Sequence, residues 1–247
     1  MSDRITRLMR MITIVVFTTF LSASVNAQNA TFYQPLSQRT PLGQTAGWLT
    51  YIHGHRSNWL QPVEITVSDG ADVSVYTESA EPAGTAASPA VVAVNPGHTY
   101  RLRLTNMPEF PDAELYPSIE ILDRLHPPAG EENHYPIPVP ISNDDIRLAL
   151  AGRLVTRVIY LEPPSLAQQL DPLNREIEQS VVPSENLLQE ADRLGRPMII
   201  VRIGDRRPSR FRATSIFYGT GGTAEMRSDE LKAPRPPQIT STTLRVR

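Results

Sequence analysis

Two alternating strands joined by a tight turn constrain the fold of this chain more than any other feature. Val63, Ile65 and Val67 alternate with polar residues, and Asp69-Gly70 leads into a second alternating run. Period-two alternation buries one face of a strand and leaves the other in water, and Asp-Gly suits the positive φ angles of a hairpin turn. The pattern predicts a β-hairpin in an antiparallel sheet with one buried face.

Further strand signals follow along the middle of the chain. The apolar run 91–94 leads through Pro96-Gly97, which suits the central positions of a type II turn, into the alternating run 100–104. Another strand is expected over 118–122. Hairpins separated by turn signals, each with one wet face, are typical of a β-sandwich.

Prolines become frequent after residue 125, and short helices follow them. Proline lacks an N–H donor, so the segment 135–140 suits an extended arm packed on the sheet or along its edge. Two short helices are expected at about 142–152 and 184–195, each ending at a glycine and each followed by an apolar strand. The predicted fold class is mainly β, an antiparallel β-sandwich-like domain with two short helices in its second half. An α+β description also fits.

The N-terminus has the pattern of a cleaved secretory signal peptide. Arg4, Arg7 and Arg10 precede the apolar stretch 11–21, and small residues run up to Ala27. The alternative is an uncleaved membrane anchor, but a spanning helix needs about 20 apolar residues and this stretch is shorter. The sequence predicts cleavage after Ala27 and export to the periplasm or the extracellular space.

Composition narrows the choice of partners. The chain has no cysteine and a formal net charge of −2, so thiol chemistry is excluded and a basic surface of the kind that binds nucleic acid is not expected. No run after the signal peptide is apolar enough to span a bilayer. An envelope protein or a polysaccharide is the expected kind of partner, and the oligomeric state stays open.

The same features divide the chain into four segments. The signal peptide (1–27) and a flexible lead-in (28–45) precede one folded domain over 46–208, whose helical additions begin at about 143. The segment 209–247 is rich in arginine and proline, and we expect a largely flexible tail there.

The middle of the chain also carries a distinctive set of strings. They include YRLRLTNMP at 100–108, ELYPSIEILDRL at 114–125 and LAGRLVTRVIYLE at 150–162, with shorter strings at 61–63, 136–138 and 191–197. Over about residues 48–208 this set resembles a family of exported proteins from planctomycete-type bacteria. That family has no assigned activity, so the resemblance implies export and one folded unit and supplies no catalytic residue.

His53 and His55 form the first candidate site. If the segment 48–53 is the first strand, residues i and i+2 point the same way, and both imidazoles could bind one zinc or copper ion. A transition-metal site normally needs three or four ligands, and the spacing of the other histidines does not require one. Two hydrogen-bonded surface histidines are the alternative.

Two charged clusters are further candidates. Carboxylates at 112–114 and 143–145 could bind calcium, although their spacing matches no EF-hand loop and acidic residues at a helix N-terminus have a simpler electrostatic role. Arg206, Arg207 and Arg210 could bind a phosphate, an acidic glycan or the acidic face of a partner. A solvated charged edge that discourages strand aggregation is the alternative for these arginines.

Aromatic residues complete the set of candidates. Trp48, Tyr51 and Trp59 could stack on sugars, or they could belong to the core. No nucleophile elbow, zinc-protease motif or phosphate loop occurs in the sequence. The sequence therefore favours an exported, non-enzymatic binding or structural module of the cell envelope or extracellular space that needs no cofactor. The alternatives are a metal-dependent enzyme that uses His53 and His55, and a carbohydrate-binding module.

Overall fold

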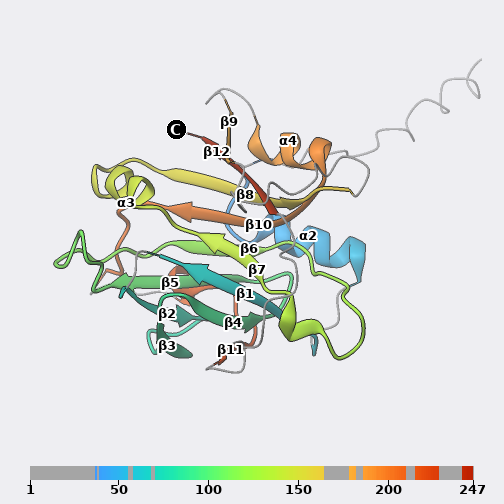
Figure 1. Cartoon of the computed structure of the whole chain (residues 1–247), viewed down its shortest axis with the longest axis horizontal. Coiled ribbons are helices and arrows are strands. Elements are labelled where there is room, and N and C mark those ends of the chain that lie inside the picture. The colour runs from blue at the N-terminus through green and yellow to red at the C-terminus, as the bar shows by residue number, and fades with distance from the viewer. Residues whose placement is uncertain are drawn as a thin grey trace, which may run out of the picture. The chain divides into compact units, whose positions relative to one another are not determined.

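The computed structural model describes residues 37, 39–54, 58–67, 70–163, 178–181, 186–209, 215–227 and 241–246. All of these residues belong to the second of two compact units, Leu36–Arg247. Within these ranges the strands form two sheets, of four and eight strands (Figure 1).

The order of strands in each sheet follows mostly antiparallel pairing. The small sheet runs β11 (Ala224–Arg227), β4 (Ala90–Val94), β1 (Gln61–Thr66), β7 (Ile137–Pro140). The large sheet runs β3 (Gly84–Ala87), β2 (Asp72–Tyr76), β5 (Thr99–Thr105), β6 (Ser118–Ile121), β10 (Arg196–Ile203), β8 (Val155–Leu161), β12 (Ser241–Val246), β9 (Glu178–Val181). Among the described strands, the pairs β1–β7 and β12–β9 are parallel.

The two hairpins predicted at Asp69-Gly70 and Pro96-Gly97 are wrong. β1 pairs with β4 and β7, whereas β2 pairs with β3 and β5. β4 pairs with β1 and β11, whereas β5 pairs with β2 and β6. The two strands of each predicted hairpin therefore belong to different sheets, because alternation specifies which face of a strand is buried but not which strand it pairs with.

The two sheets share one apolar core, which confirms the predicted β-sandwich. Val63 and Ile65 enter this core from the small sheet, and Leu102 and Leu104 enter it from the large sheet. All four side chains are fully buried. Burying one such side chain contributes about 1.5–3 kcal/mol relative to leaving it exposed, so period-two alternation selects the face on which the sheets meet.

The proline-rich segment packs along a sheet edge, as predicted. A 3-10 turn, η1 (Glu132–His134), leads into β7, which pairs with β1 at one edge of the small sheet. Ile137 and Val139 are buried in the core, whereas the prolines that alternate with them are half-buried. An edge strand tolerates proline because one of its sides has no ladder partner.

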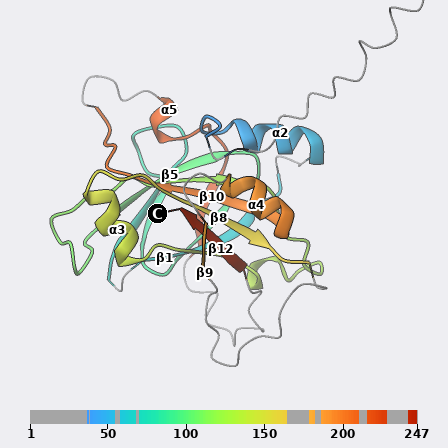
Figure 2. The same ribbon diagram turned by 90° about the horizontal axis from the view of Figure 1, so that it is seen from above.

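Both helices predicted for the second half of the domain are present. α3 (Asn143–Leu150) begins at a capping box made by Ser142 and Asp145, and its Ile146 packs into the main core. α4 (Leu187–Leu194) lies across β8 and β10 on the outer face of the large sheet (Figure 2). None of the helices in the described ranges has the length and apolar character needed to cross a membrane.

The prediction of a strand over residues 48–53 is wrong. These residues belong to a helix, α2 (Gln44–His53), with Gly43 and Gly54 in left-handed conformation at its two ends. Left-handed glycines are typical helix terminators. Helical spacing lets Ala46 and the next turn of α2 pack together on the outer face of the large sheet, a contact that a strand at this position could not make.

The structure also differs from the prediction of a largely flexible tail over 209–247. α5 (Ser215–Tyr218) packs Phe217 and Tyr218 into a small aromatic cluster, where both are buried. β11 then extends the small sheet beside β4, and β12 pairs with β8 in the large sheet. The two buried aromatic side chains supply apolar surface that the surrounding arginine- and proline-rich composition obscures.

Gly195, between α4 and β10, lies close to the backbone of β8. A Cβ at this position would lie 3.0 Å from the carbonyl carbon of Leu161 and from Cδ2 of Tyr160, and closer still to the Leu161 carbonyl oxygen. We expect Gly195→Ala to lower the free energy of unfolding by about 1–3 kcal/mol, measured in urea, because the backbone must shift. The control is Gly47→Ala in α2, where a Cβ meets open space. An equal response of the two variants would contradict the close approach.

Candidate functional site

The outer side of α2 carries three large side chains that face solvent. Trp48, Tyr51 and Ile52 are 40%, 90% and 70% exposed. Their spacing of i, i+3 and i+4 places them on one face of the helix. We call these three residues the α2 stripe. In the described part of the chain they are three of the five large hydrophobic residues that are exposed, the others being Leu150 and Leu154.

A carboxylate from the sheet holds the N-terminal end of α2. The residue before the helix, Gly43, has no side chain to cap it. The fully buried Glu120 of β6 takes that role, because its Oε1 accepts a hydrogen bond of 3.0 Å from the N–H of Ala46. Its Oε2 accepts a hydrogen bond of 2.8 Å from Nη1 of Arg202 in β10. The negative charge thus lies at the positive end of the helix and beside a guanidinium.

A second carboxylate lies at the C-terminal end of α2. Nδ1 of His53 is 3.5 Å from Oδ2 of Asp123, and Nη1 of Arg196 is 3.4 Å from the same oxygen. The other oxygen, Oδ1, accepts a hydrogen bond of 2.7 Å from the N–H of Arg124. Because Asp123 is buried, this carboxylate links the last turn of α2 to β10. His53, the first metal candidate, therefore has an anchoring role in this structure.

Trp59 lies in a different setting from the other two aromatic candidates. It is half-buried, with its ring centroid 4.4 Å from the guanidinium carbon of Arg124. Its carbonyl accepts a hydrogen bond of 3.1 Å from Asn95 Nδ2. Nearby, burial and then repulsion from Arg124 and Arg196 lower the pKa of His126. Trp59 is thus engaged in a cation–π contact, whereas Trp48 and Tyr51 are presented to solvent.

The geometry assumed for a two-histidine metal site is absent at the end of α2. His53 is the last helical residue and Gly54 turns the chain in left-handed conformation, so the strand that would align His53 with His55 is not formed there. His55 itself lies outside the described residues. Among the residues that are described, no group of three or more His, Asp or Glu side chains is placed to hold a metal ion. Zinc and copper binding stay predictions.

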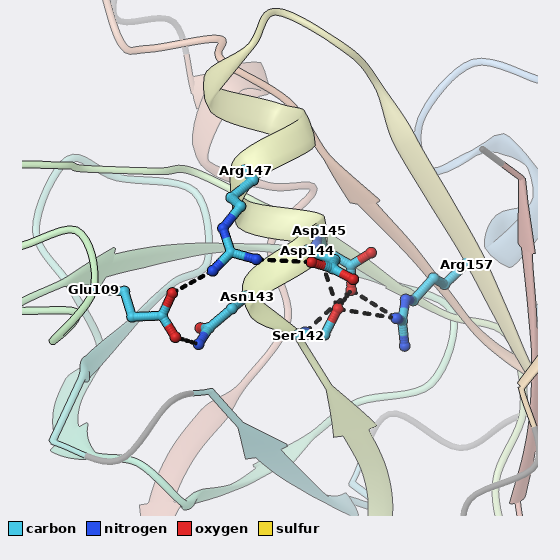
Figure 3. Close-up of polar contacts among 7 residues, drawn as sticks. All are labelled: Glu109, Ser142, Asn143, Asp144, Asp145, Arg147 and Arg157. Carbon is cyan, nitrogen blue, oxygen red and sulfur yellow. Dashed lines mark hydrogen bonds and ion pairs between the residues drawn. The ribbon is translucent and has the colours of Figure 1, made fainter.

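Two of the carboxylates suggested for calcium, Asp144 and Asp145, engage arginines and the N-terminal end of α3 (Figure 3). Asp145 Oδ2 accepts a hydrogen bond of 3.1 Å from the N–H of Ser142 and lies 2.7 Å from Nη2 of Arg157. Asp144 Oδ1 lies 2.9 Å from Nη1 of Arg147. This network caps α3 and ties it to β8, which is the simpler electrostatic role considered for the acidic run.

The structure places one of the three candidate arginines against a ring. The guanidinium carbon of Arg206 lies 5.8 Å from the ring centroid of Phe217. Arg207 is exposed, and Arg210 lies outside the described residues. Arg101 of β5 contacts the same ring at 4.5 Å. Sequence reasoning missed Arg101, because alternation placed it on the wet face of its strand and gave no sign that α5 covers that face.

Comparison with protein-family models, curated proteins and solved structures gives no match to this chain. The resemblance to a family of exported planctomycete-type proteins therefore stays a prediction. The arrangement around α2 combines an exposed apolar surface with two buried carboxylates, Glu120 and Asp123, that hold the two ends of the helix. Such an arrangement suits recognition, because the side chains that reach solvent are large and their backbone is held in place.

Proposed function

We propose that this protein is an exported, non-enzymatic binding module of the cell envelope or extracellular space, and that it docks a partner protein through the α2 stripe. The observation that carries the proposal is the exposure of Trp48, Tyr51 and Ile52 on one helix face. Anchors spaced i, i+3 and i+4 are the pattern by which a helix enters an apolar groove of a partner.

The composition of the α2 stripe supports binding energetically. Tryptophan and tyrosine are enriched among the residues that dominate protein–protein affinity. Each removes a large apolar area from water when it docks, at about 25 cal/mol per Å². Glu120 and Asp123 hold the two ends of α2, so little backbone freedom is left to lose on binding.

A protein groove fits the α2 stripe better than a sugar does. Trp48 and Tyr51 lie one helical turn apart and could stack on sugar rings, as a carbohydrate-binding module requires. Ile52, however, is 70% exposed between their positions and the helix end. Its aliphatic side chain offers neither a flat ring nor a hydrogen bond, and it gains free energy only in a dry apolar contact.

Site-specific photo-cross-linking tests the proposal. A photoreactive residue is placed at Ile52, and at Leu154 as the control, because Leu154 is 68% exposed on another element. After incubation with native envelope protein, we expect a discrete protein adduct from position 52 and none from position 154. The purified partner should then lose about thirtyfold in affinity with Tyr51→Ala, the effect of removing one hot spot of about 2 kcal/mol. Leu154→Ala should leave the affinity unchanged.

A fluorescence titration separates the protein partner from a polysaccharide. The chain has two tryptophans, so Trp59→Phe leaves Trp48 as the only reporter and Trp48→Phe leaves Trp59 as its control. The proposal fails if polysaccharide fractions shift the emission of Trp48 in a saturable way while no protein adduct forms at position 52. It also fails if positions 52 and 154 give the same adducts.

A further inference from the structure

Arg101 is a buried cation whose hydrogen bonds go to neutral groups. It lies on the outer face of β5 and is only 7% exposed. Its Nε donates a hydrogen bond of 2.7 Å to the carbonyl of Phe217, and its Nη1 donates one of 3.0 Å to the carbonyl of Tyr116. These bonds satisfy part of the guanidinium fork, which carries five N–H donors. They contribute no negative charge.

No carboxylate among the described residues neutralises Arg101, and no acceptor there bonds its Nη2. The neighbouring arginines on the same face differ in this respect. Arg103 pairs with Glu114 and Arg202 pairs with Glu120. Taking a cation out of water costs several kcal/mol unless a counter-charge offsets it. Of these three arginines, Arg101 is therefore the one that has no carboxylate partner among the described residues.

A second cation faces the same aromatic ring. The Phe217 ring centroid lies 4.5 Å from the guanidinium carbon of Arg101 and 5.8 Å from that of Arg206. Burial, and then repulsion from Arg206, lower the pKa of Arg101 to about 10. The Phe217 ring that both cations contact belongs to a buried aromatic cluster with Tyr76, Tyr116 and Tyr218. Two like charges beside low-dielectric walls create a local positive potential that attracts anions.

We propose that Arg101 and Arg206 bind an oxyanion (a carboxylate, sulfate or phosphate group) beside the ring of Phe217. Arg101 supplies a guanidinium that two hydrogen bonds fix in place and that is only 7% exposed, with no acceptor for its Nη2 among the described residues. Arg206 supplies an exposed side chain that can close over the ligand. Guanidinium groups match the planar and tetrahedral oxygens of these anions with two parallel hydrogen bonds. The bound anion is the counter-charge that the buried guanidinium lacks.

Anion titration at constant ionic strength tests the site. Inorganic sulfate and phosphate, and an acidic polysaccharide carrying the same groups, are titrated into the mature protein and followed calorimetrically. We expect saturable binding of at least one of them, weakened at least tenfold by Arg206→Gln. Arg207→Gln is the matched control, because it removes the same charge from the next exposed residue, and it should change the affinity less than twofold. Both side chains are exposed, so neither change threatens folding.

The outcomes distinguish a specific anion site from general attraction of anions to positive charge. They also distinguish a free anion from an acidic polysaccharide as the ligand. The proposal is overturned if Arg206→Gln and Arg207→Gln weaken the anion affinity equally, or if no anion binds in a saturable way. Binding of the polysaccharide with no response to inorganic ions assigns the oxyanion to a glycan, and binding of the inorganic ions alone assigns it to a free anion. In the supporting cases the NMR signal of the Arg101 Nε–H should shift with the same affinity, while that of Arg103 should not.

Discussion

Replacing Arg157 with methionine is expected to lower the free energy of unfolding by about 3–5 kcal/mol, because it strips a buried carboxylate of its guanidinium partner. Nη2 of Arg157 lies 2.7 Å from Oδ2 of Asp145, and the two side chains are 1% and 0% exposed (Figure 3). Asp145 also completes the capping box of α3. The loss should therefore loosen α3 as well as the end of β8.

Urea unfolding followed by circular dichroism measures this effect, and Arg147→Met is its matched control. Arg147 pairs with Asp144 and Glu109 on the exposed side of the same helix, and exposed pairs contribute about 1 kcal/mol or less. Adding Asp145→Asn to Arg157→Met should restore part of the stability, since the uncompensated charge is then gone. A loss from Arg157→Met no larger than that from Arg147→Met would refute the buried ion pair as a determinant of stability.

Removing the Glu120 side chain should have a comparable effect, concentrated on α2. Glu120→Ala leaves Arg202 without its carboxylate, at about 3–5 kcal/mol for a broken buried pair, and it removes a helix cap, at about 0.5–2 kcal/mol. Glu120→Gln keeps an acceptor for the Ala46 N–H, so its free energy of unfolding should fall less than that of Glu120→Ala. Hydrogen exchange of the α2 amides should speed up in both variants.

Glu114→Ala is the control for Glu120→Ala on the same sheet face. Glu114 pairs with Arg103 and accepts a hydrogen bond of 3.0 Å from the hydroxyl of Tyr116, but it is partly exposed, and its removal should leave α2 exchange unchanged. Where Glu120→Gln stays folded, its affinity for the partner of the α2 stripe should fall, because the helix is held less firmly. Unchanged exchange at Ala46 in Glu120→Ala would show that α2 is capped by another group.

The strands could be predicted because each carries its own local pattern. Alternation over 63–67, 100–104 and 118–122 requires only that apolar residues share one side of a strand. The capping box at Ser142 is local as well, since its partner is three residues away. These strands and this cap follow from short-range physics, and the structure has each of them. The pairing of the strands does not follow from it: the strands on either side of Asp69-Gly70, and those on either side of Pro96-Gly97, belong to different sheets.

α2 could not be predicted in the same way, because its stabilising contacts are distant in sequence. Its cap comes from Glu120, which is separated by 74 residues from Ala46. The local signals that remained were the glycines at positions 43 and 54, which bound the helix. Trp48 and Tyr51 were nevertheless identified as candidate binding residues, whereas Ile52 gained its role only when the helical spacing placed it beside them.

Arg101 was missed for a related reason. Alternation separates the two faces of β5 correctly, but it cannot say which parts of the outer face another segment covers. α5 lies more than a hundred residues further along the chain, as the hydrogen bond from Arg101 to Phe217 shows, with a separation of 116 residues. Arg101 is therefore the more buried of the two arginines on that strand, although alternation places both on the same face.

The prolines of β7 limit how another β-strand could pair with this edge of the small sheet. The N–H of Ile141 donates to the carbonyl of Thr66, so odd-numbered residues of this segment direct their amides toward β1 and even-numbered residues direct theirs away from it. The even-numbered positions 138 and 140 are proline and have no amide hydrogen to offer. An approaching strand finds no N–H donor at these two positions, which disfavours edge-to-edge pairing of the small sheet on this side.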